Sequence, residues 1–227
     1  MATLGLIGSG HIGSTLARLA VDGGLDVVLS NSRGPETLSD VVAELGPRAR
    51  AATAEEAAAA GDWVVVTIPF KAYQQVPKAP LVGKTVLDTN NYYPQRDGQV
   101  AALDAGKTTG SELLQDHLEQ SHVVKVFNNI FFKHLTDLSR PKGAADRTSL
   151  PIAGDDAGAK ARATELLDAL GFDALDAGPL AEGWRYEPGT PAYGAPYGSG
   201  SGDDFMAQPG GPASAADVSA ALAAAQR

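Results

Sequence analysis

The sequence contains no cysteine, which excludes disulfide bonds, zinc–thiolate sites, iron–sulfur clusters and a catalytic thiol. Basic residues are also scarce: 18 lysines and arginines stand against 27 aspartates and glutamates, and the net charge is -9. Nucleic acids and anionic membrane surfaces bind basic faces, so we expect neither as a partner. Only four histidines occur, none in a spacing typical of metal ligands, and no metal site is predicted.

Long apolar runs are missing as well. No segment approaches the roughly 20 residues that a membrane span requires. The first strand-like segment starts at Thr3, which leaves no room for a signal peptide, so we expect a cytoplasmic protein. The 227 residues are 44% hydrophobic, which is enough to build a core for one α/β domain with an appendage.

The most informative stretch is an apolar strand, residues 3–7, that runs into Gly-Ser-Gly-His-Ile-Gly at residues 8–13 and then into an amphipathic helix. This order is typical of dinucleotide binding. Gly8 permits a tight turn, Gly10 lets a pyrophosphate approach the backbone, and Gly13 lets the helix pack against the strand. The helix N-terminus then offers unpaired N–H groups to the phosphates. A turn that binds nothing is the alternative.

The end of the second expected strand, residues 26–30, indicates which dinucleotide binds. NAD-specific folds place an Asp or Glu here to bind the ribose 2′-OH. This chain has Asn31, Ser32 and Arg33 instead. Arg33 can form an ion pair with a 2′-phosphate and Ser32 can donate to it, whereas a carboxylate would repel it. The pattern therefore favours NADP, with a solvated polar turn as the alternative.

Strands and helices alternate to about residue 180, which predicts an α/β fold with a doubly wound parallel sheet, the Rossmann NAD(P)-binding fold, over residues 1–181. Further strands are expected at residues 49–53, 63–68, 85–88, 122–127, 150–153 and 172–176. Residues 182–227 are expected to form a Gly- and Pro-rich tail that ends in a helix, and to cover the site or a dimer partner. The helix has a thin, alanine-rich apolar face, so it must dock, for example on a partner subunit, or fray.

Polar and aromatic loops follow several strands, and ligands bind at the carboxyl edge of such a sheet. We expect these loops to surround the nicotinamide and a hydride acceptor. The residues expected to bind the cofactor are Gly8, Ser9, Gly10, His11, Ile12, Gly13, Asn31, Ser32, Arg33, Thr67, Ile68, Pro69 and Asn91. Those expected in the acceptor pocket are Phe70, Asn90, Tyr92, Asn128 and Asn129.

Five motifs together carry a family resemblance: residues 8–13, Asn-Ser-Arg at 31–33, Thr-Ile-Pro at 67–69, Gly-Asp-Asp at 154–156 and Asp-Ala-Gly-Pro-Leu at 176–180. Over residues 1 to about 181 the chain resembles the NADPH:coenzyme F420 oxidoreductase family. It is also similar to the cytoplasmic reductase domains of membrane ferric reductases.

The resemblance implies hydride transfer between NADP and an 8-hydroxy-5-deazaflavin, coenzyme F420. It implies that Ser32 and Arg33 hold the 2′-phosphate and that Ile68 and Pro69 flank the nicotinamide ribose. Family members often carry a further basic residue where this chain has Thr37. The loops around the acceptor pocket and the tail also depart from the family pattern.

We predict no catalytic acid or base, because hydride transfer between two rings needs only stacking, orientation and excluded water. A carbonyl or imine reductase, with Lys125 or a tyrosine as proton donor, is one alternative, and an NADP sensor without catalysis is another. Lys125 is either a buried functional lysine or an edge-strand residue that snorkels to solvent. Tyr92 and Tyr93 either contact an acceptor ring or pack at a dimer interface. With no second lobe to cover the nicotinamide, the tail or a partner subunit must do so, and a homodimer is the default expectation.

Overall fold

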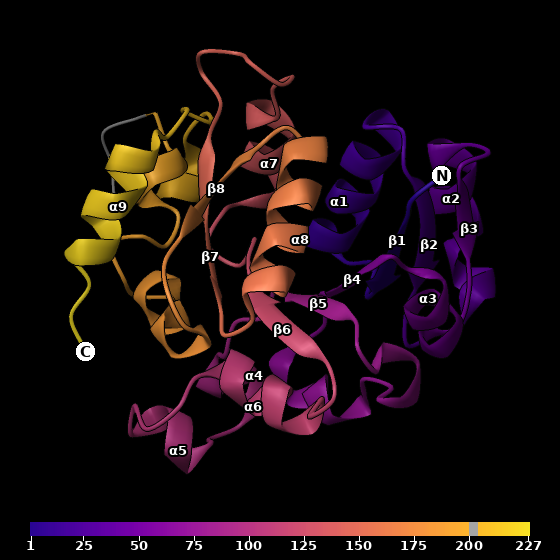
Figure 1. The fold of residues 1–227 in the computed structure, drawn as a ribbon, viewed down its shortest axis with the longest axis horizontal. Coiled ribbons are helices and arrows are strands. Elements are labelled where there is room, and N and C mark those ends of the chain that lie inside the picture. The colour runs from indigo at the N-terminus through magenta and orange to yellow at the C-terminus, as the bar shows by residue number, and fades with distance from the viewer. Residues whose placement is uncertain (200–203) are drawn as a thin grey trace.

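The computed structural model describes residues 1–199 and 204–227, in which eight strands form one sheet in the order β3-β2-β1-β4-β5-β6-β7-β8 (Figure 1). The strands are β1 (Thr3–Ile7), β2 (Asp26–Ser30), β3 (Ala49–Ala51), β4 (Trp63–Val66), β5 (Thr85–Asp88), β6 (His122–Lys125), β7 (Ser149–Gly154) and β8 (Asp173–Asp176). The chain starts in the middle of the sheet, and the strand order reverses between β1 and β4. In open α/β sheets such a reversal marks the crevice where ligands bind. The predicted Rossmann-like α/β fold is confirmed.

The described helices are α1 (His11–Asp22), α2 (Ser39–Leu45), α3 (Ala54–Ala60), α4 (Pro94–Asp97), α5 (Ala101–Asp104), α6 (Gly110–His117), α7 (Phe132–Leu138), α8 (Ala157–Ala169) and α9 (Ala215–Ala223). Hydroxyl and carboxylate caps start several of them: Thr53 and Thr109 form capping boxes, and Asp156 accepts from the N–H of Ala159. Across the described ranges, every helix falls short of the length and apolar character that crossing a bilayer requires.

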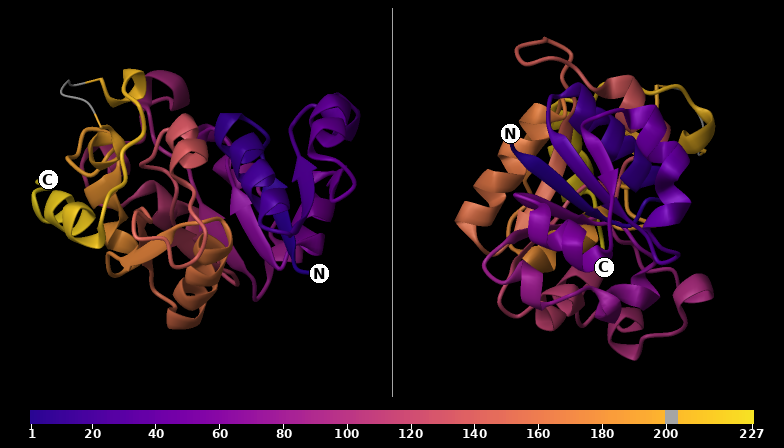
Figure 2. Two further views of the ribbon diagram at one scale, coloured as in Figure 1. Left: turned by 90° about the horizontal axis from the view of Figure 1, so that it is seen from above. Right: turned by 90° about the vertical axis from the view of Figure 1, so that its right-hand side faces the viewer.

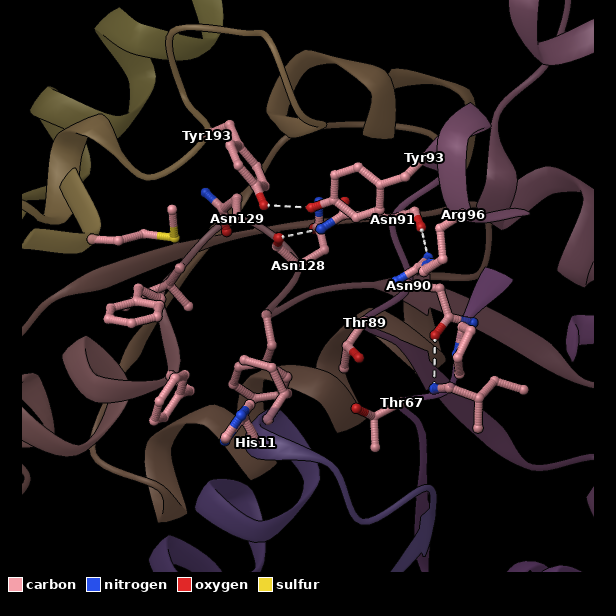
Figure 3. Close-up of a pocket in the computed structure, with 18 residues that line it drawn as sticks. His11, Thr67, Thr89, Asn90, Asn91, Tyr93, Arg96, Asn128, Asn129 and Tyr193 are labelled. Atoms are coloured by element: carbon pink, nitrogen blue, oxygen red, sulfur yellow. Dashed lines mark hydrogen bonds between the residues drawn. The ribbon is translucent and has the colours of Figure 1, made fainter. Parts of the chain in front are cut away.

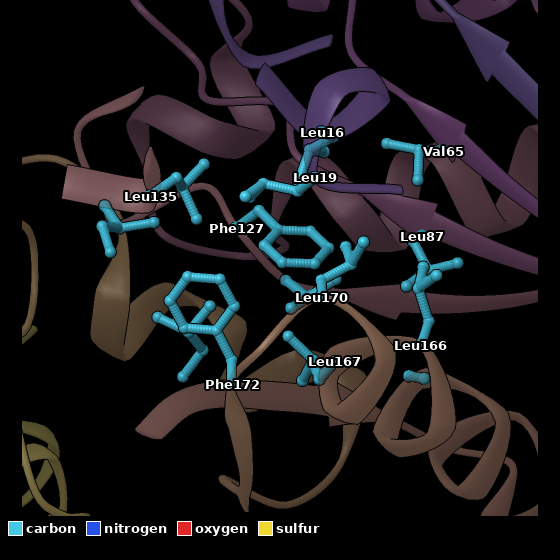
Figure 4. Packing of buried hydrophobic residues seen from close by; sticks show 14 of the residues in the cluster. Leu16, Leu19, Val65, Leu87, Phe127, Leu135, Leu166, Leu167, Leu170 and Phe172 are labelled. Carbon is cyan, nitrogen blue, oxygen red and sulfur yellow. The ribbon is translucent and has the colours of Figure 1, made fainter. Parts of the chain in front are cut away.

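Side chains of the central strands alternate between two apolar layers, as the pleat of a strand requires. Val65 belongs to the larger cluster together with Leu16 of α1 and Leu166 of α8, whereas Val64 and Val66 pack in a second cluster with α3 and α6. Helices α1, α7 and α8 therefore cover one face of the sheet and α3 and α6 the other. Figure 4 shows the side chains of the first layer meeting around Phe127.

The direction of β7 corrects the prediction of a wholly parallel sheet. β6 and β7 pair antiparallel, with Val124 opposite Gly154, and only then does β8 run parallel to β7. Helix α7 has seven residues, which span about 10 Å at 1.5 Å per residue. The connection through α7 does not return to the opposite edge of the sheet, so β7 starts near the edge where β6 ends. The 13 residues of α8 do make a full crossover, and β8 returns parallel.

The tail packs at the β7–β8 end of the sheet, at the opposite end from β3 (Figure 2). It consists of loops and short 3-10 turns at Leu180–Tyr186, Ala195–Tyr197 and Phe205–Ala207, as its Gly- and Pro-rich composition predicts. Tyr186 and Tyr197 are fully buried in the larger cluster, which also contains Val218 and Leu222 of α9. The terminal helix thus docks on its own chain.

Candidate cofactor and acceptor site

The glycine loop has the geometry that a pyrophosphate requires. Gly8 has a φ of 112°, and a Cβ there would overlap the carbonyl oxygen of Thr67. A Cβ on Gly13 would overlap the carbonyl oxygen of Gly8, because α1 packs so closely on the turn. By contrast, a Cβ on Gly10 would have no heavy atom within 4 Å. Gly8 and Gly13 therefore allow neighbouring backbone segments to pack closely, and Gly10 borders open space where a phosphate can approach.

The N-terminus of α1 is free to bind an anion. Gly10 is the N-cap residue, and within the described part of the chain no side chain caps this end and no acid lies in the first turn. Its amides and the positive end of the helix dipole therefore face the loop without a competing carboxylate. The site thus fits the phosphates of a dinucleotide on local chemistry alone.

The loop after β2 presents Arg33 to solvent in a turn stabilised by its neighbours. The Asn31 side chain accepts from the N–H of Arg33 (2.9 Å) and donates to the hydroxyl of Thr37 (2.8 Å), which donates to the carbonyl of Gly34 (2.8 Å). Ser32 and Arg33 are both exposed, and Arg33 has no ion pair among the described residues. Thr37, which replaces a basic residue of the family pattern, therefore stabilises the turn, and Arg33 is left to supply the charge.

A pocket of about 340 Å³ opens at the carboxyl ends of β4, β5 and β6, next to the start of α1 (Figure 3). It is lined by His11, Ile12, Thr67, Ile68, Pro69, Thr89, Asn90, Asn91, Tyr93, Arg96, Phe127, Asn128, Asn129, Ile130, Phe131, Phe132, Tyr193 and Met206. The three loops predicted to meet at this edge do meet there. Thr67, Ile68 and Pro69 continue from β4 directly beside the glycine loop, since the N–H of Thr67 donates to the carbonyl of Ile7.

Two residues predicted in the acceptor pocket lie outside it. Phe70 is 2% exposed and stacks on Tyr73 with ring centroids 5.0 Å apart. The Tyr92 hydroxyl donates to Asp104 (2.8 Å) and accepts from the N–H of Val100 (2.9 Å), which ties it to α5. Both rings contact neighbouring loop residues and each other, with ring centroids 5.6 Å apart. Neither side chain lines this pocket.

The tail contributes pocket residues that sequence reasoning missed, namely Tyr193 and Met206. The hydroxyls of Tyr93 and Tyr193 are 2.7 Å apart, and burial raises the pKa of Tyr193 well above its usual value. In Figure 3 this pair lies at the end of the pocket opposite His11. The tail thus lines this pocket of its own chain. The only sequence signal was an aromatic residue in a Gly- and Pro-rich segment.

Arg96 is a further lining residue without a sequence signal. Its guanidinium donates to Asp97 (2.8 Å) and to the carbonyl of Asn91 (2.8 Å), and it lies 4.9 Å from the centroid of the Tyr93 ring. Its charge is thus compensated by the adjacent carboxylate. Arg96 therefore contributes to the pocket wall and orients the loop between β5 and α4.

Asn90 is anchored through three of its polar groups. Its N–H donates to Asp88 (3.0 Å), its carbonyl accepts from Lys125 (3.2 Å), and its side-chain oxygen accepts from the N–H of Ile68 (3.0 Å). Its side-chain nitrogen Nδ2 is buried and has no partner in the described ranges. An unpaired buried donor is costly, so Asn90 is poised to donate to a ligand next to Ile68.

Lys125 belongs to a buried charge network behind this loop. Its side chain is fully buried, with Nζ 3.2 Å from a carboxylate oxygen of Glu187 and 3.2 Å from the hydroxyl of Ser111. That hydroxyl donates to Asp88 at 2.6 Å. Burial raises the pKa of Asp88, and the Lys125 charge opposes this rise. Lys125 is therefore buried and does not snorkel, and it does not line the pocket, where a proton donor would have to lie.

The fold and the site together define a class of protein: a Rossmann-like domain whose glycine loop, exposed Arg33 turn and pocket at the carboxyl edge of the sheet suit a dinucleotide-binding protein. Residues 3–92 match the family described as "NADP oxidoreductase coenzyme F420-dependent". The resemblance to this family expected from the sequence is thereby confirmed over these residues.

Two solved structures are similar over most of the chain. The hypothetical protein SMa0349 from Sinorhizobium meliloti is 28% identical with a TM-score of 0.71, and the match covers 83% of this chain and 91% of that one. A protein from Arthrobacter sp. FB24, described provisionally as an F420-dependent NADP reductase, is 27% identical with a TM-score of 0.66, over 79% of this chain and 85% of that one. The Escherichia coli K12 protein YjhV is 38% identical over 60 residues, 26% of this chain and 44% of that protein. The chain thus matches less than half the length of this curated relative.

Proposed function

We propose that this protein transfers a hydride from NADPH to the ring of a flavin or a deazaflavin such as coenzyme F420. The observation that carries the proposal is the nature of the pocket wall. Its titratable side chains contact neighbours: His11 stacks on Phe132 with centroids 4.5 Å apart, the hydroxyls of Tyr93 and Tyr193 pair with each other, and Arg96 pairs with Asp97. Such a wall suits ring-to-ring transfer, which needs no general acid.

The residues of the chain would act by binding, orientation and exclusion of water. Bound NADPH supplies the hydride chemistry itself. The glycine loop, Ser32 and Arg33 would hold the phosphates, and the loop at Ile68 and Pro69 would support the nicotinamide. Phe131 and Met206 offer apolar surface against which a second planar ring can pack.

A panel of acceptors tests this function. NADPH oxidation would be followed anaerobically by the loss of the reduced-nicotinamide absorbance near ~340 nm, with a deazaflavin, FMN, quinones and cyclic imines as acceptors. We expect turnover with the deazaflavin or with FMN and little with imines, because the Tyr93 and Tyr193 hydroxyls pair with each other and Lys125 does not line the pocket. Fast reduction of an imine would favour the carbonyl or imine reductase. NADPH binding without turnover of any acceptor would favour a sensor.

A further inference from the structure

We propose that Asn128 and Asn129 form a pair of hydrogen-bond acceptors that binds an N–H group of the ligand in the pocket. Both side chains line the pocket, and they are only 5% and 1% exposed. Both side-chain oxygens, Oδ1, are buried without a hydrogen-bond partner among residues 1–199 and 204–227. Buried amide oxygens are normally paired, so two unpaired ones on consecutive residues that line a pocket point to a ligand that donates to them.

The orientation of the Asn129 amide follows from its partners in the tail. Its Nδ2 donates to the carbonyl of Ala192 (2.9 Å) and to the hydroxyl of Tyr197 (3.1 Å), which occupies both of its protons. The backbone carbonyl of Asn129 also accepts from the N–H of Gly194 (2.8 Å). Nδ2 of Asn129 thus uses both of its protons in hydrogen bonds to the tail, and Oδ1 lies on the other side of the amide.

Asn128 is oriented in the same way by two other segments. Its Nδ2 donates to the carbonyl of Tyr186 (2.9 Å) and to Oδ1 of Asn91 (3.1 Å), while its backbone carbonyl accepts from Nδ2 of Asn91 (2.7 Å). Rotation of either asparagine amide by a half turn would place an oxygen against a backbone carbonyl, which only accepts. The positions of Oδ1 are therefore fixed by the network.

The backbone before the pair is strained, which supports a role beyond packing. Phe127 has a φ of 64°, and it is the one described residue other than glycine with a positive φ. This left-handed conformation costs free energy for a residue with a Cβ, and such strain concentrates at ligand sites. It directs the chain so that both asparagines reach the pocket wall directly after β6.

The chemistry that matches two acceptors is an N–H donor. Carboxylates, phosphates and quinone oxygens would face the pair with lone pairs only, so the pair selects against them. In a site of the proposed function two groups carry a suitable N–H: the carboxamide of the nicotinamide, and the imide nitrogen N3 of a flavin or deazaflavin. The inference rests on that function for the identity of these ligands.

Two pairs of ligands distinguish the sources, each measured by isothermal titration and therefore independently of turnover. The first pair is NADP⁺ and its 3-acetylpyridine analogue, in which a methyl group replaces the amide nitrogen. The second is FMN and N3-methyl-FMN, titrated into the NADP⁺ complex. We expect the ligand without the N–H to bind at least about tenfold more weakly in one of the two pairs. Equal affinities within both pairs would overturn the inference.

Asn129→Leu and Asn128→Leu extend the test to the protein. In a folded variant, the affinity difference within the sensitive pair should shrink to about twofold or less, because the acceptor is gone. A thermal melt establishes folding, and the comparison of ligands on the unmodified protein remains decisive if neither variant folds. If the unmodified protein discriminates within a ligand pair but reduces none of the hydride acceptors, only the proposed function is refuted. If it reduces an acceptor but binds both members of each pair equally, only the role of Asn128 and Asn129 is refuted.

Discussion

Gly10→Ala should abolish tight NADP(H) binding while leaving the fold intact. The φ and ψ of Gly10, -72° and -166°, are open to alanine, and the added methyl group would meet no heavy atom within 4 Å. We therefore expect the free energy of unfolding to change by less than about 1 kcal/mol. The methyl group would, however, occupy the space through which a pyrophosphate approaches the loop, and we expect affinity to fall by about 100-fold, roughly 2.7 kcal/mol.

Gly8→Ala is the matched comparison, since the same methyl group is added two residues away. There it would overlap the carbonyl oxygen of Thr67 in a backbone with a φ of 112°. We expect a loss of several kcal/mol of stability. Denaturant unfolding and titration with NADPH measure both quantities in both variants. NADPH binding to Gly10→Ala with wild-type affinity would show that no phosphate lies against this glycine.

Lys125→Met should cause a large loss of stability. It removes the cation that faces Asp88, which is fully buried, and Glu187, whose side chain is 23% exposed. Breaking a buried pair by removing one partner typically costs about 3–5 kcal/mol. Lys142→Met is the control, because its ion pair with Asp168 has a similar length, 2.8 Å, but an 83% exposed lysine side chain. We expect that variant to lose less than about 1 kcal/mol.

The destabilisation of Lys125→Met should depend on pH. Burial raises the pKa of Asp88 in the folded state above its ordinary value, and Lys125 limits that rise. A carboxyl with a raised folded-state pKa loses stability as pH rises from the ordinary value of 3.8 through the folded-state value. Without Lys125 this loss should be larger and extend to higher pH. Urea unfolding should therefore show a greater deficit at pH 7 than at pH 5, and a deficit that grows as the pH falls would contradict this account.

Much of the fold follows from local sequence patterns. Strands β1, β2 and β5 begin and end at the predicted residues, because each is an apolar run bounded by glycine or polar turns. The direction of β7 does not follow from such a pattern, since alternation identifies a strand but not its orientation. Its direction depends on the path of the connection between β6 and β7, which apolar patterning does not define.

The candidate site likewise contains residues that local sequence patterns predict and residues that they do not. The close turn of the glycine loop was predictable because it depends on residues close together in the sequence, and the role of Arg33 stays a prediction. Tyr193 reaches the pocket only through the packing of the tail, and it lies 100 residues from its partner Tyr93. Phe70 and Tyr92 follow the correct strands but turn into the loops, because the direction of a side chain depends on a backbone path that composition does not define.

The central claim is that the nucleotide is NADP, held across the glycine loop and Arg33. Calorimetric titration of NADP⁺ and NAD⁺ into the wild type and Arg33→Ala tests it most directly, with Arg18→Ala, which removes an exposed guanidinium from α1, as the control. We predict one site per chain. NADP⁺ should bind at least about tenfold more tightly than NAD⁺ to the wild type and to Arg18→Ala, whereas the two nucleotides should bind to Arg33→Ala with about equal affinity. Equal affinity of the wild type for both nucleotides, or an equal weakening of both by Arg33→Ala, would contradict the assignment.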